Sequence, residues 1–385
     1  MPTIIRARLS VAKLPLLVPF GHAAMTRRSN TTVFVVLESS DGALGIGEAL
    51  PRRYVTGEEP EDVVATLRAP LERLVGTSVG EAWDLLPTLC VPLMPVIGGL
   101  GACCALELAC LDLLSRTAKT SADQILKLPA SSHAPPPVTA TVPLLPPWLM
   151  KLVIRSFEWA GARDFKIKLK GDLTHDEKLL DHVSKTLQAD SDMRVDYNMA
   201  LSFADGLPYL ERIAARYPRL TWIEEPLSAT DRHHMPELQR HFDGRFTFCA
   251  DESVCRESDL TQLIESGAYR AVNIRVGKHG GPSRAASLAH RAHEAGLAVQ
   301  IGSLVGETAV LSNAGALVAR YAPSVRYLEV GLSPMILRSS PVRGAVTPGR
   351  GMKLDFEKLP LCGLSTPHQA WQKRTGRIEE IYAAH

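Results

Sequence analysis

From residue 138 onward, charged and polar residues recur at the ends of short, otherwise apolar runs. The residues in question are Lys168, Asp196, Glu224, Asp251, Arg275, Ser303 and Glu329. They follow one another at intervals of 24 to 28 residues, which is about the length of one strand–helix unit. Because a buried parallel strand is ordinarily apolar throughout, charged residues at successive strand ends indicate a shared chemical site.

Three of these residues, Asp196, Glu224 and Asp251, are carboxylates on neighbouring expected strands. Three unpaired anions at close range repel one another, and a divalent cation relieves that repulsion. An all-oxygen ligand set favours Mg²⁺ or Mn²⁺ over zinc. The alternative is that each acid caps the helix that follows its strand. Capping accounts for one such residue more readily than for three at this spacing.

Lys166 and Lys168 stand two residues apart within the run 164–169, so they share one face of the expected strand. Taken alone, the pair fits a solvated strand edge. Beside a metal-bound carboxylate, Lys168 is a candidate base for the proton on the adjacent carbon, because the metal stabilises the enediolate that forms. Lys166 would lower the pKa of Lys168 and add positive charge to the site.

The elements that must position these residues form a repeating pattern. Short runs rich in β-branched residues alternate with helical patterns of ten to fifteen residues. The runs are 138–144, 164–169, 193–197, 220–224, 246–250, 271–275, 297–301 and 325–330. Eight such units predict an α/β fold, a (β/α)₈ TIM barrel over residues 138–333. The last helix is left open because the chain becomes rich in Pro and Gly after Gly331, and a capping box at Thr174 and Glu177 predicts one helix start.

Residues 1–130 do not repeat and predict a small α+β domain. Strands are expected over 31–38 and 43–48, and a helix is expected to begin at Glu59-Pro60. The segment 91–114 is apolar enough to span a bilayer, but its prolines, glycines and acids favour a buried helix over about 102–116. Residues 130–137 are a plausible linker, and the tail 334–385 is expected to return to the first domain.

Composition and charge exclude some classes of partner. The 385 residues carry a formal charge of +2 with acids and bases interspersed, which gives no basis for binding nucleic acid or a membrane surface. The seven cysteines include no Cys-x-x-Cys pair, and the N-terminus lacks a secretory pattern. We therefore expect a cytoplasmic protein with reduced thiols. The expected partner is a small-molecule carboxylate substrate, on the grounds of Lys168 and the three carboxylates described above.

These residues resemble the enolase superfamily, in particular the muconate cycloisomerase branch of the muconate lactonizing enzyme/mandelate racemase group. The matching stretches are FKIK at 165–168, VDYN at 195–198, WIEEP at 222–226, ADES at 250–253 and NIRVGKHGG at 273–281, with GIGE at 45–48 and YVTGE at 54–58 in the N-terminal part. The resemblance implies a capping domain over a modified barrel. It also implies Mg²⁺ on Asp196, Glu224 and Asp251, Lys168 as the acid/base, and a homo-oligomer.

One position departs from that branch, which usually carries a second lysine on the sixth strand, facing Lys168. Arg275 stands there instead, and arginine stays protonated and is a poor general base. Lys278, in the glycine-rich loop that follows, is a possible substitute. The departure favours one-base chemistry, a cycloisomerisation or a syn elimination, over two-base racemisation or epimerisation of amino-acid or dipeptide derivatives.

Several residues are expected to contact the substrate or to support the site. Dipeptide epimerases of this branch tend to carry Asp-x-Asp on the eighth strand, whereas LEVGLSP at 328–334 is closer to the cycloisomerase pattern. The expected substrate contacts are Asn198, Lys278, Ser303, Glu329 and Tyr54, and Glu252 is expected to lie behind them. Ser303 has an alternative role as a helix N-cap.

Two other classes of function stay open from the sequence. One is a Schiff-base aldolase with Lys168 as its nucleophile, although such an enzyme needs no cluster of carboxylates. The other is a non-catalytic barrel that binds a metal and a carboxylate. The replacement of the usual second lysine by Arg275 is consistent with this alternative.

Overall fold

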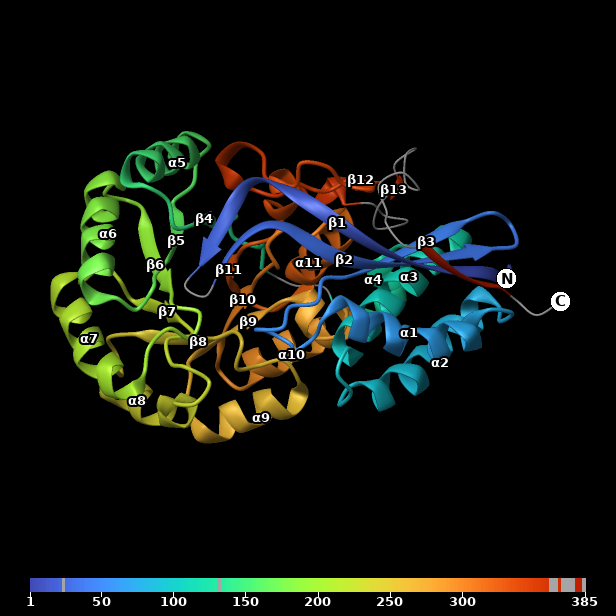
Figure 1. The fold of residues 1–385 in the computed structure, drawn as a ribbon, viewed down its shortest axis with the longest axis horizontal. Coiled ribbons are helices and arrows are strands. Elements are labelled where there is room, and N and C mark those ends of the chain that lie inside the picture. Colours follow the sequence, from blue (N-terminus) through green and yellow to red (C-terminus); the bar gives the residue numbers. More distant parts are fainter. Residues whose placement is uncertain (23–24, 130–132, 360–365, 368–377, 383–385) are drawn as a thin grey trace.

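Eight parallel strands form the central sheet, in the same order in space as in the sequence. The computed structural model describes residues 1–22, 25–129, 133–359, 366–367 and 378–382 (Figure 1). The strands are β4 (Ala140–Val142), β5 (Asp164–Lys168), β6 (Asp192–Asp196), β7 (Trp222–Glu224), β8 (Thr247–Ala250), β9 (Ala271–Ile274), β10 (Ala298–Ile301) and β11 (Val325–Leu328). The amide of Thr139 donates a 2.7 Å hydrogen bond to the carbonyl of Leu328, which joins the two ends of the sheet into a barrel.

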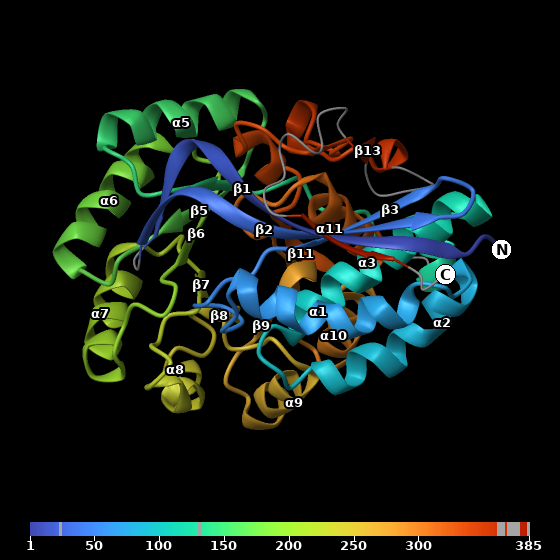
Figure 2. The ribbon, with the colours of Figure 1, turned by 45° about the vertical axis from the view of Figure 1, so that its right-hand side comes forward.

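Helices cover the outside of this barrel (Figures 1 and 2). They are α5 (Pro147–Trp159), α6 (Leu173–Thr186), α7 (Phe203–Arg216), α8 (Met235–His241), α9 (Glu257–Ser266), α10 (Pro282–Glu294) and α11 (Ala309–Tyr321). After β11 the described chain forms the short 3₁₀ helix η4 (Ser333–Ile336) where an eighth α-helix would stand in a regular barrel. Each of the eight predicted runs contains a strand, so the predicted modified barrel is confirmed.

Alternation along the strands separates the core from the site. On β5, Phe165 and Ile167 are fully buried in the main apolar core, which includes helix residues such as Leu180 and Val183. Lys166 and Lys168 point the other way, toward Glu224 of β7 and Asp196 of β6. Residues two apart share a face of a strand, so one short run supplies both the core and the chemistry.

A four-stranded antiparallel sheet forms the capping domain. Its order is β14 (Ile378–Tyr382), β1 (Ile4–His22), β2 (Met25–Ser39) and β3 (Leu44–Ala49), so the C-terminal tail returns to the first domain as predicted. The helices α1 (Pro60–Leu74), α2 (Val79–Cys90), α3 (Gly99–Ala118) and α4 (Ala122–Leu126) complete the domain. The long β1–β2 ribbon reaches over the barrel (Figures 1 and 2), where Arg338 donates its amide to the carbonyl of Pro15 at 2.9 Å.

The apolar segment before residue 118 is a buried helix, as expected. Gly47 of β3 lies directly against α3, since a Cβ there would stand 1.8 Å from the carbonyl oxygen of Ala105. No helix in the described part of the chain is long and apolar enough to cross a membrane. The six cysteines that are described are all buried and free.

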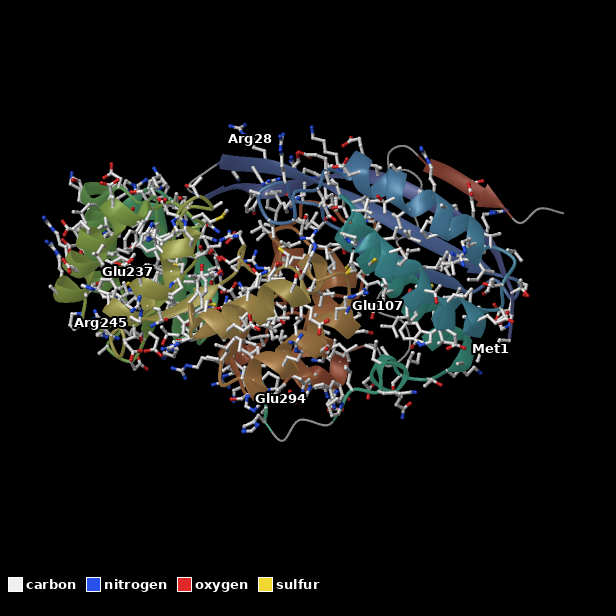
Figure 3. All side chains as sticks on the ribbon, turned by 90° about the horizontal axis from the view of Figure 1, so that it is seen from below. Met1, Arg28, Glu107, Glu237, Arg245 and Glu294 are labelled. Carbon is white, nitrogen blue, oxygen red and sulfur yellow. The ribbon has the colours of Figure 1, made fainter. Side chains whose placement is uncertain are left out.

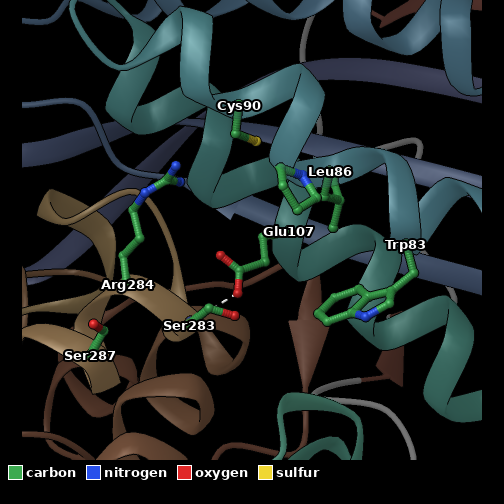
Figure 4. A pocket seen from close by; sticks show the side chains of 8 residues that line it. Trp83, Leu86, Cys90, Glu107, Ser283, Arg284 and Ser287 are labelled. Carbon is green, nitrogen blue, oxygen red and sulfur yellow. Dashed lines mark hydrogen bonds between the residues drawn. The ribbon is translucent and has the colours of Figure 1, made fainter. Parts of the chain in front are cut away.

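Carboxylates of the cap hold the first turns of two barrel helices. Helix α10 has Gly281 at its N-cap, which offers no side chain, and Glu107 of α3 accepts the amide of Ser283 at 2.8 Å (Figure 4). Glu48 of β3 accepts the amides of Thr308 and Leu311 at the start of α11, at 3.0 and 3.1 Å. These contacts satisfy free helix amides and fix the cap on the barrel.

Two details of the prediction need correction or lie outside the described residues. The capping box at Thr174 and Glu177 is wrong, because α6 begins earlier and Asp172 caps it by accepting the amide of His175 at 2.8 Å. Glu177 instead pairs with Arg212 of α7. The long strand β1 was not predicted. Residues 130–132 of the expected linker lie outside the described residues, so the boundaries 1–130, 138–333 and 334–385 stay a proposal.

Candidate active site

A cavity of about 310 Å³ lies where the carboxyl ends of the barrel strands meet the cap. The barrel contributes Lys166, Lys168, Asn198, Arg275, Ser303 and Glu329 to its wall. Arg27, Arg52 and Tyr54 come from the cap. Phe157, Val305, Leu332, Met335 and Ile336 supply an apolar side. Most of the residues predicted from the strand ends therefore face one cavity at the usual place of a barrel active site.

The two lysines of β5 occupy different depths in this cavity. Lys168 is 7% exposed; its Nζ contacts the carboxylate of Asp196 and donates to Oδ1 of Asn198 at 2.9 Å. Lys166 lies deeper, with its Nζ 2.7 Å from Glu329 and 3.1 Å from Glu224. Burial lowers the pKa of Lys166, but those two carboxylates raise it above its usual value. Lys166 is therefore a fixed cation, and Lys168 is the more exposed of the two lysines.

Shared cations bring the three predicted metal ligands together. Asp196, Glu224 and Asp251 are fully buried. Lys166 Nζ lies 3.6 Å from Asp196 and 3.1 Å from Glu224. The Arg275 guanidinium lies 3.4 Å from Glu224 and also contacts Asp251. Burial raises the pKa of Glu224, but Lys166 and Arg275 hold it well below its usual range, so this carboxylate is ionised.

The donor set of these carboxylates fits Mg²⁺. Within the ranges that the structure describes, no group of three or more His, Cys, Asp or Glu is placed so that it could hold a metal ion directly. The carboxylate oxygens face cationic side chains instead. All three are nevertheless buried oxygen donors, the type of ligand that Mg²⁺ prefers. Asn273 and Gln300 each donate to Glu224 at 3.0 Å, and the Asn198 amide donates to Asp196 at 2.8 Å. The assignment of these ligands stays a prediction.

Arg275 stands across the barrel from Lys168. Strands β5 and β9 are four positions apart in a closed sheet of eight, which puts them on opposite sides. Burial lowers the pKa of Arg275, yet Asp251 and Glu224 raise it well above its usual value. Lys278, the possible substitute for a second base, contacts Asp251 instead of the cavity. Its Nζ is fully buried, donates to Oδ1 of Asp251 at 2.8 Å and is not part of the cavity wall.

Some of the remaining predicted residues line the cavity, and others lie behind the residues that line it. Asn198 lines the cavity and donates to Glu252 at 3.1 Å, so Glu252 lies behind Asn198, and its part in supporting the site stays a prediction. Ser303 also lines the cavity, and its hydroxyl donates to the carbonyl of Glu329 at 2.9 Å. Ser303 is not a helix N-cap, because Thr308 caps α11.

A layer of polar residues below the cavity was missed from the sequence. Arg194 is 1% exposed and donates to Gln300 at 2.7 Å and to Glu329 at 2.8 Å. Asn273 and Gln300 belong to the same layer. The position of these residues in the sequence could have revealed the layer. Arg194 stands two residues before Asp196, and Asn273 two residues before Arg275, so each pair shares one strand face. Lys166 and Lys168 have the same relation. Arg27 and Arg52 of the cap gave no such signal.

A closed barrel with lysines and carboxylates at its carboxyl ends, under a separate α+β cap, defines a class of barrel enzymes. The model of the family described as enolase C-terminal domain-like matches residues 149–358, more than half of the chain. The chain belongs to the enolase superfamily, in the mandelate racemase/muconate lactonizing enzyme group, as the resemblance predicted.

Curated relatives cover most of the chain. N-succinyl-L-Arg/Lys racemase of Bacillus cereus is 28% identical over 316 residues, which are 81% of this chain and 82% of that protein. L-Lys-D/L-Arg epimerase of Methylococcus capsulatus is 30% identical over 319 residues, which are 82% of this chain and 86% of that protein. These relatives are named as racemases and epimerases.

Solved structures show the same fold. A dipeptide epimerase from Cytophaga hutchinsonii, complexed with Mg and the dipeptide D-Ala-L-Val, has a TM-score of 0.86 at 21% identity and covers 98% of this chain and 99% of its own. Muconate lactonizing enzyme from Pseudomonas fluorescens, complexed with muconolactone, has a TM-score of 0.85 at 20% identity and covers 97% of this chain and 100% of its own.

Proposed function

We propose that the chain is a Mg²⁺-dependent enzyme that removes and returns the proton α to the carboxylate of a small amino-acid derivative. Lys168 is the acid/base of this reaction. The observation that carries the proposal is the placement of Lys168 in the cavity wall, held by Asn198 and Asp196 beside three buried carboxylates. A cytoplasmic location and a homo-oligomeric state stay predictions.

Each residue of the site has its own role in the proposed reaction. Asp196, Glu224 and Asp251 would hold Mg²⁺, which supplies charge stabilisation at the substrate carboxylate. Lys168 takes the proton from the α-carbon, and Asn198 holds its Nζ in position by accepting a hydrogen bond. Lys166 and Arg275 stay cationic and favour the negative charge that develops. The cap is held over the barrel by Arg52 and Asn30, which both donate to the carbonyl of Val305.

The relatives favour a racemase or epimerase over the cycloisomerase or lyase that the sequence put first. Those relatives are named for amino-acid or dipeptide derivatives. One observation favours the one-base outcome. Racemisation needs proton transfer on both faces of the α-carbon, and the residue opposite Lys168 is Arg275, whose raised pKa makes it a weak base. We take racemisation or epimerisation as the leading outcome and one-base chemistry as the second candidate.

Solvent exchange separates the two outcomes. The protein is incubated in D₂O with Mg²⁺ and N-acylated amino acids or dipeptides, and deuterium at the α-carbon is followed by NMR. A racemase or epimerase puts deuterium into both configurations, whereas one-base chemistry labels one configuration only or eliminates a group. If labelling is confined to one configuration, Arg275→Lys is expected to introduce label in the other. Absence of exchange, elimination and cyclisation with every compound would overturn the proposed function.

A further inference from the structure

Glu225 is a fully buried carboxylate that follows Glu224 at the end of β7. Successive residues of a strand point to opposite faces. Glu224 faces Lys166 inside the barrel. Glu225 faces the loop after β8 instead, and it is not among the residues that line the active-site cavity. Any effect of Glu225 on the reaction must therefore pass through the residues that it holds.

The side chain of Glu225 holds the loop after β8 at two points. Its Oε2 accepts the amide of Asp251 at 2.7 Å and the amide of Ser253 at 3.0 Å. Its Oε1 accepts the hydroxyl of Tyr269 at 3.0 Å and the hydroxyl of Ser253. Hydrogen bonds to a charged acceptor are stronger than those between neutral groups. The loop 251–253 is therefore fixed on both sides of its middle residue, Glu252.

The loop held in this way carries two side chains that act on the candidate active site. Asp251 is a proposed Mg²⁺ ligand, and its carboxylate turns toward Arg275. Glu252 accepts the side-chain amide of Asn198 at 3.1 Å, and Asn198 in turn accepts a hydrogen bond from Lys168 at 2.9 Å. A displacement of the loop would therefore move a proposed metal ligand and also loosen the proposed base.

The backbone at Glu225 is strained. Its φ of 37° lies in the left-handed region, as do the φ values of Asn198 and Met199, at 45° and 64°. The Met199 amide donates to the carbonyl of Glu225 at 2.8 Å, so these strained residues join the loops after β6 and β7. Residues other than glycine rarely adopt this conformation, and where they do they cluster at functional sites. The shared strain supports a role in the geometry of the site rather than in stability alone.

We propose that Glu225 is a positioning residue, which holds the loop 251–253 so that Asp251 reaches the metal site and Glu252 supports Asn198. The inference rests on the proposed function, in which Asp251 binds Mg²⁺ and Asn198 holds Lys168. One buried side chain thus acts on both the metal site and the base without contact with the substrate.

The groups around Glu225 indicate that the reach of its side chain matters more than its charge. The four donors described above are neutral, two backbone amides and two hydroxyls. Nε of Arg232 lies 3.7 Å from the carboxylate, which is beyond hydrogen-bond distance. A glutamine can accept both amides with its oxygen and donate its NH₂ group to the hydroxyls. An aspartate keeps the charge but ends one methylene short of the loop.

Two conservative variants test this proposal, with the best compound of the solvent-exchange assay as substrate. Glu225→Asp is expected to lower kcat at saturating Mg²⁺ by about 10- to 100-fold, as is typical when a residue that orients a metal ligand is changed. The KM should change little, because Glu225 does not line the cavity. Glu225→Gln should keep a kcat close to the native value. A loss in Glu225→Gln as large as that in Glu225→Asp, or native kcat in Glu225→Asp, would overturn the proposal.

A matched control shows whether the loss of a methylene matters in itself. Glu237→Asp makes the same change at an exposed glutamate of α8, the helix that follows the same strand (Figure 3). It is expected to keep the native kcat. Thermal unfolding of each variant checks that it is folded at the temperature of the assay. A Glu225→Asp chain that does not fold would assign Glu225 to the fold instead of the site and would also overturn the proposal.

Binding of Mg²⁺ separates this inference from the proposed function. Calorimetry on the metal-free protein measures the affinity for Mg²⁺ without a substrate. Glu225→Asp is expected to lower this affinity by about tenfold, and Glu225→Gln should keep it. This result would support the inference even if no compound is turned over, in which case only the proposed function fails. Equal Mg²⁺ affinity in Glu225→Asp and the native chain would overturn the inference, whatever the turnover.

Discussion

Two groups of buried carboxylates in this molecule have different partners. At the barrel mouth, Glu224 and Glu329 face lysine and arginine side chains, which hold their pKa values below the usual range against the opposing effect of burial. At the seam between cap and barrel, Glu48 and Glu107 accept backbone amides of barrel helices. Burial there raises the pKa of both, that of Glu48 to about 7. Burial alone therefore does not mark a functional carboxylate, whereas the partners of that carboxylate do.

The contacts between cap and barrel also determine which cap residues reach the active-site cavity. Glu48 and Glu107 hold the starts of α11 and α10, and so set where the cap sits on the barrel (Figure 4). That position places Arg27 and Arg52 over the cavity. We therefore expect variants of the carboxylates between cap and barrel to change stability, and variants of the carboxylates at the strand ends to change turnover.

The largest expected effect is on turnover at the mouth. Lys168→Ala removes the proposed acid/base, and we expect kcat to fall by about 10²- to 10⁴-fold while the fold and Mg²⁺ binding persist. Exchange of the α-proton and calorimetry with Mg²⁺ measure the two properties. Lys170→Ala is the matched control, because Lys170 follows β5 and is exposed. Substantial residual exchange in Lys168→Ala would move the base to another residue.

The next effect concerns metal dependence. Chelation is expected to abolish turnover, and Mg²⁺ or Mn²⁺ is expected to restore it. Asp251→Asn should weaken Mg²⁺ binding by at least about tenfold, because a charged oxygen donor becomes a neutral amide. Glu107→Gln, at the seam, should keep the native affinity. Full activity in excess chelator, or equal Mg²⁺ affinity in Asp251→Asn and the native chain, would contradict the assignment of Asp251 to a metal site.

Most residues of the candidate active site could be predicted from the sequence, because they recur at the ends of the strands at intervals of one strand–helix unit. Lys168, Asp196 and Glu224 end the successive strands β5, β6 and β7, and Arg275 directly follows β9, so the barrel repeat brings them together at one end of the sheet. The polar layer below was missed, because a residue such as Arg194 lies inside a run that the rule for buried strands treats as apolar. The start of α6 was misplaced for a local reason, since Asp172 stands two residues before Thr174 and is an equally good cap.

The seam was not predictable for a different reason. Glu48 caps a helix 260 residues further along the chain, and Glu107 meets Ser283 across 176 residues. No local pattern records a contact between two domains at such separation. The same holds for Arg27 and Arg52, which reach the cavity only because the cap folds over the barrel mouth.

The third prediction concerns the pH dependence of stability. The pKa of Glu48 is about 7 in the folded chain against an ordinary value of 4.5, so its contribution to the free energy of unfolding is fully present below pH 4.5 and is lost as the pH rises through 7. The loss is on the order of 3 kcal/mol. Glu224 behaves in the opposite way, because its lowered pKa makes stability fall only in acid, below the usual range of a carboxyl group.

Denaturant unfolding of the native chain and Glu48→Gln at pH 5, 6, 7 and 8 measures this contribution. The native chain is expected to lose stability across this range, and the variant should lose less, because its amide does not titrate. A native chain and a variant with parallel pH profiles would show that Glu48 is ionised throughout, which would remove the contrast with the mouth carboxylates.

The smallest expected effect is at the start of α10. Glu107→Gln keeps an oxygen that accepts the Ser283 amide but removes the negative charge near the helix N-terminus, so we expect a loss of about 0.5 to 1 kcal/mol in the free energy of unfolding. Glu107→Ala also removes the acceptor and should lose about 1 to 2 kcal/mol. Because Gly281 offers no side chain in its place, no other residue at this N-cap can recover the bond. Both variants should keep the kcat of the native chain at temperatures below their unfolding transitions. A fall in kcat without a change in stability would show that Glu107 affects turnover. It would then no longer hold that the carboxylates between cap and barrel affect stability alone.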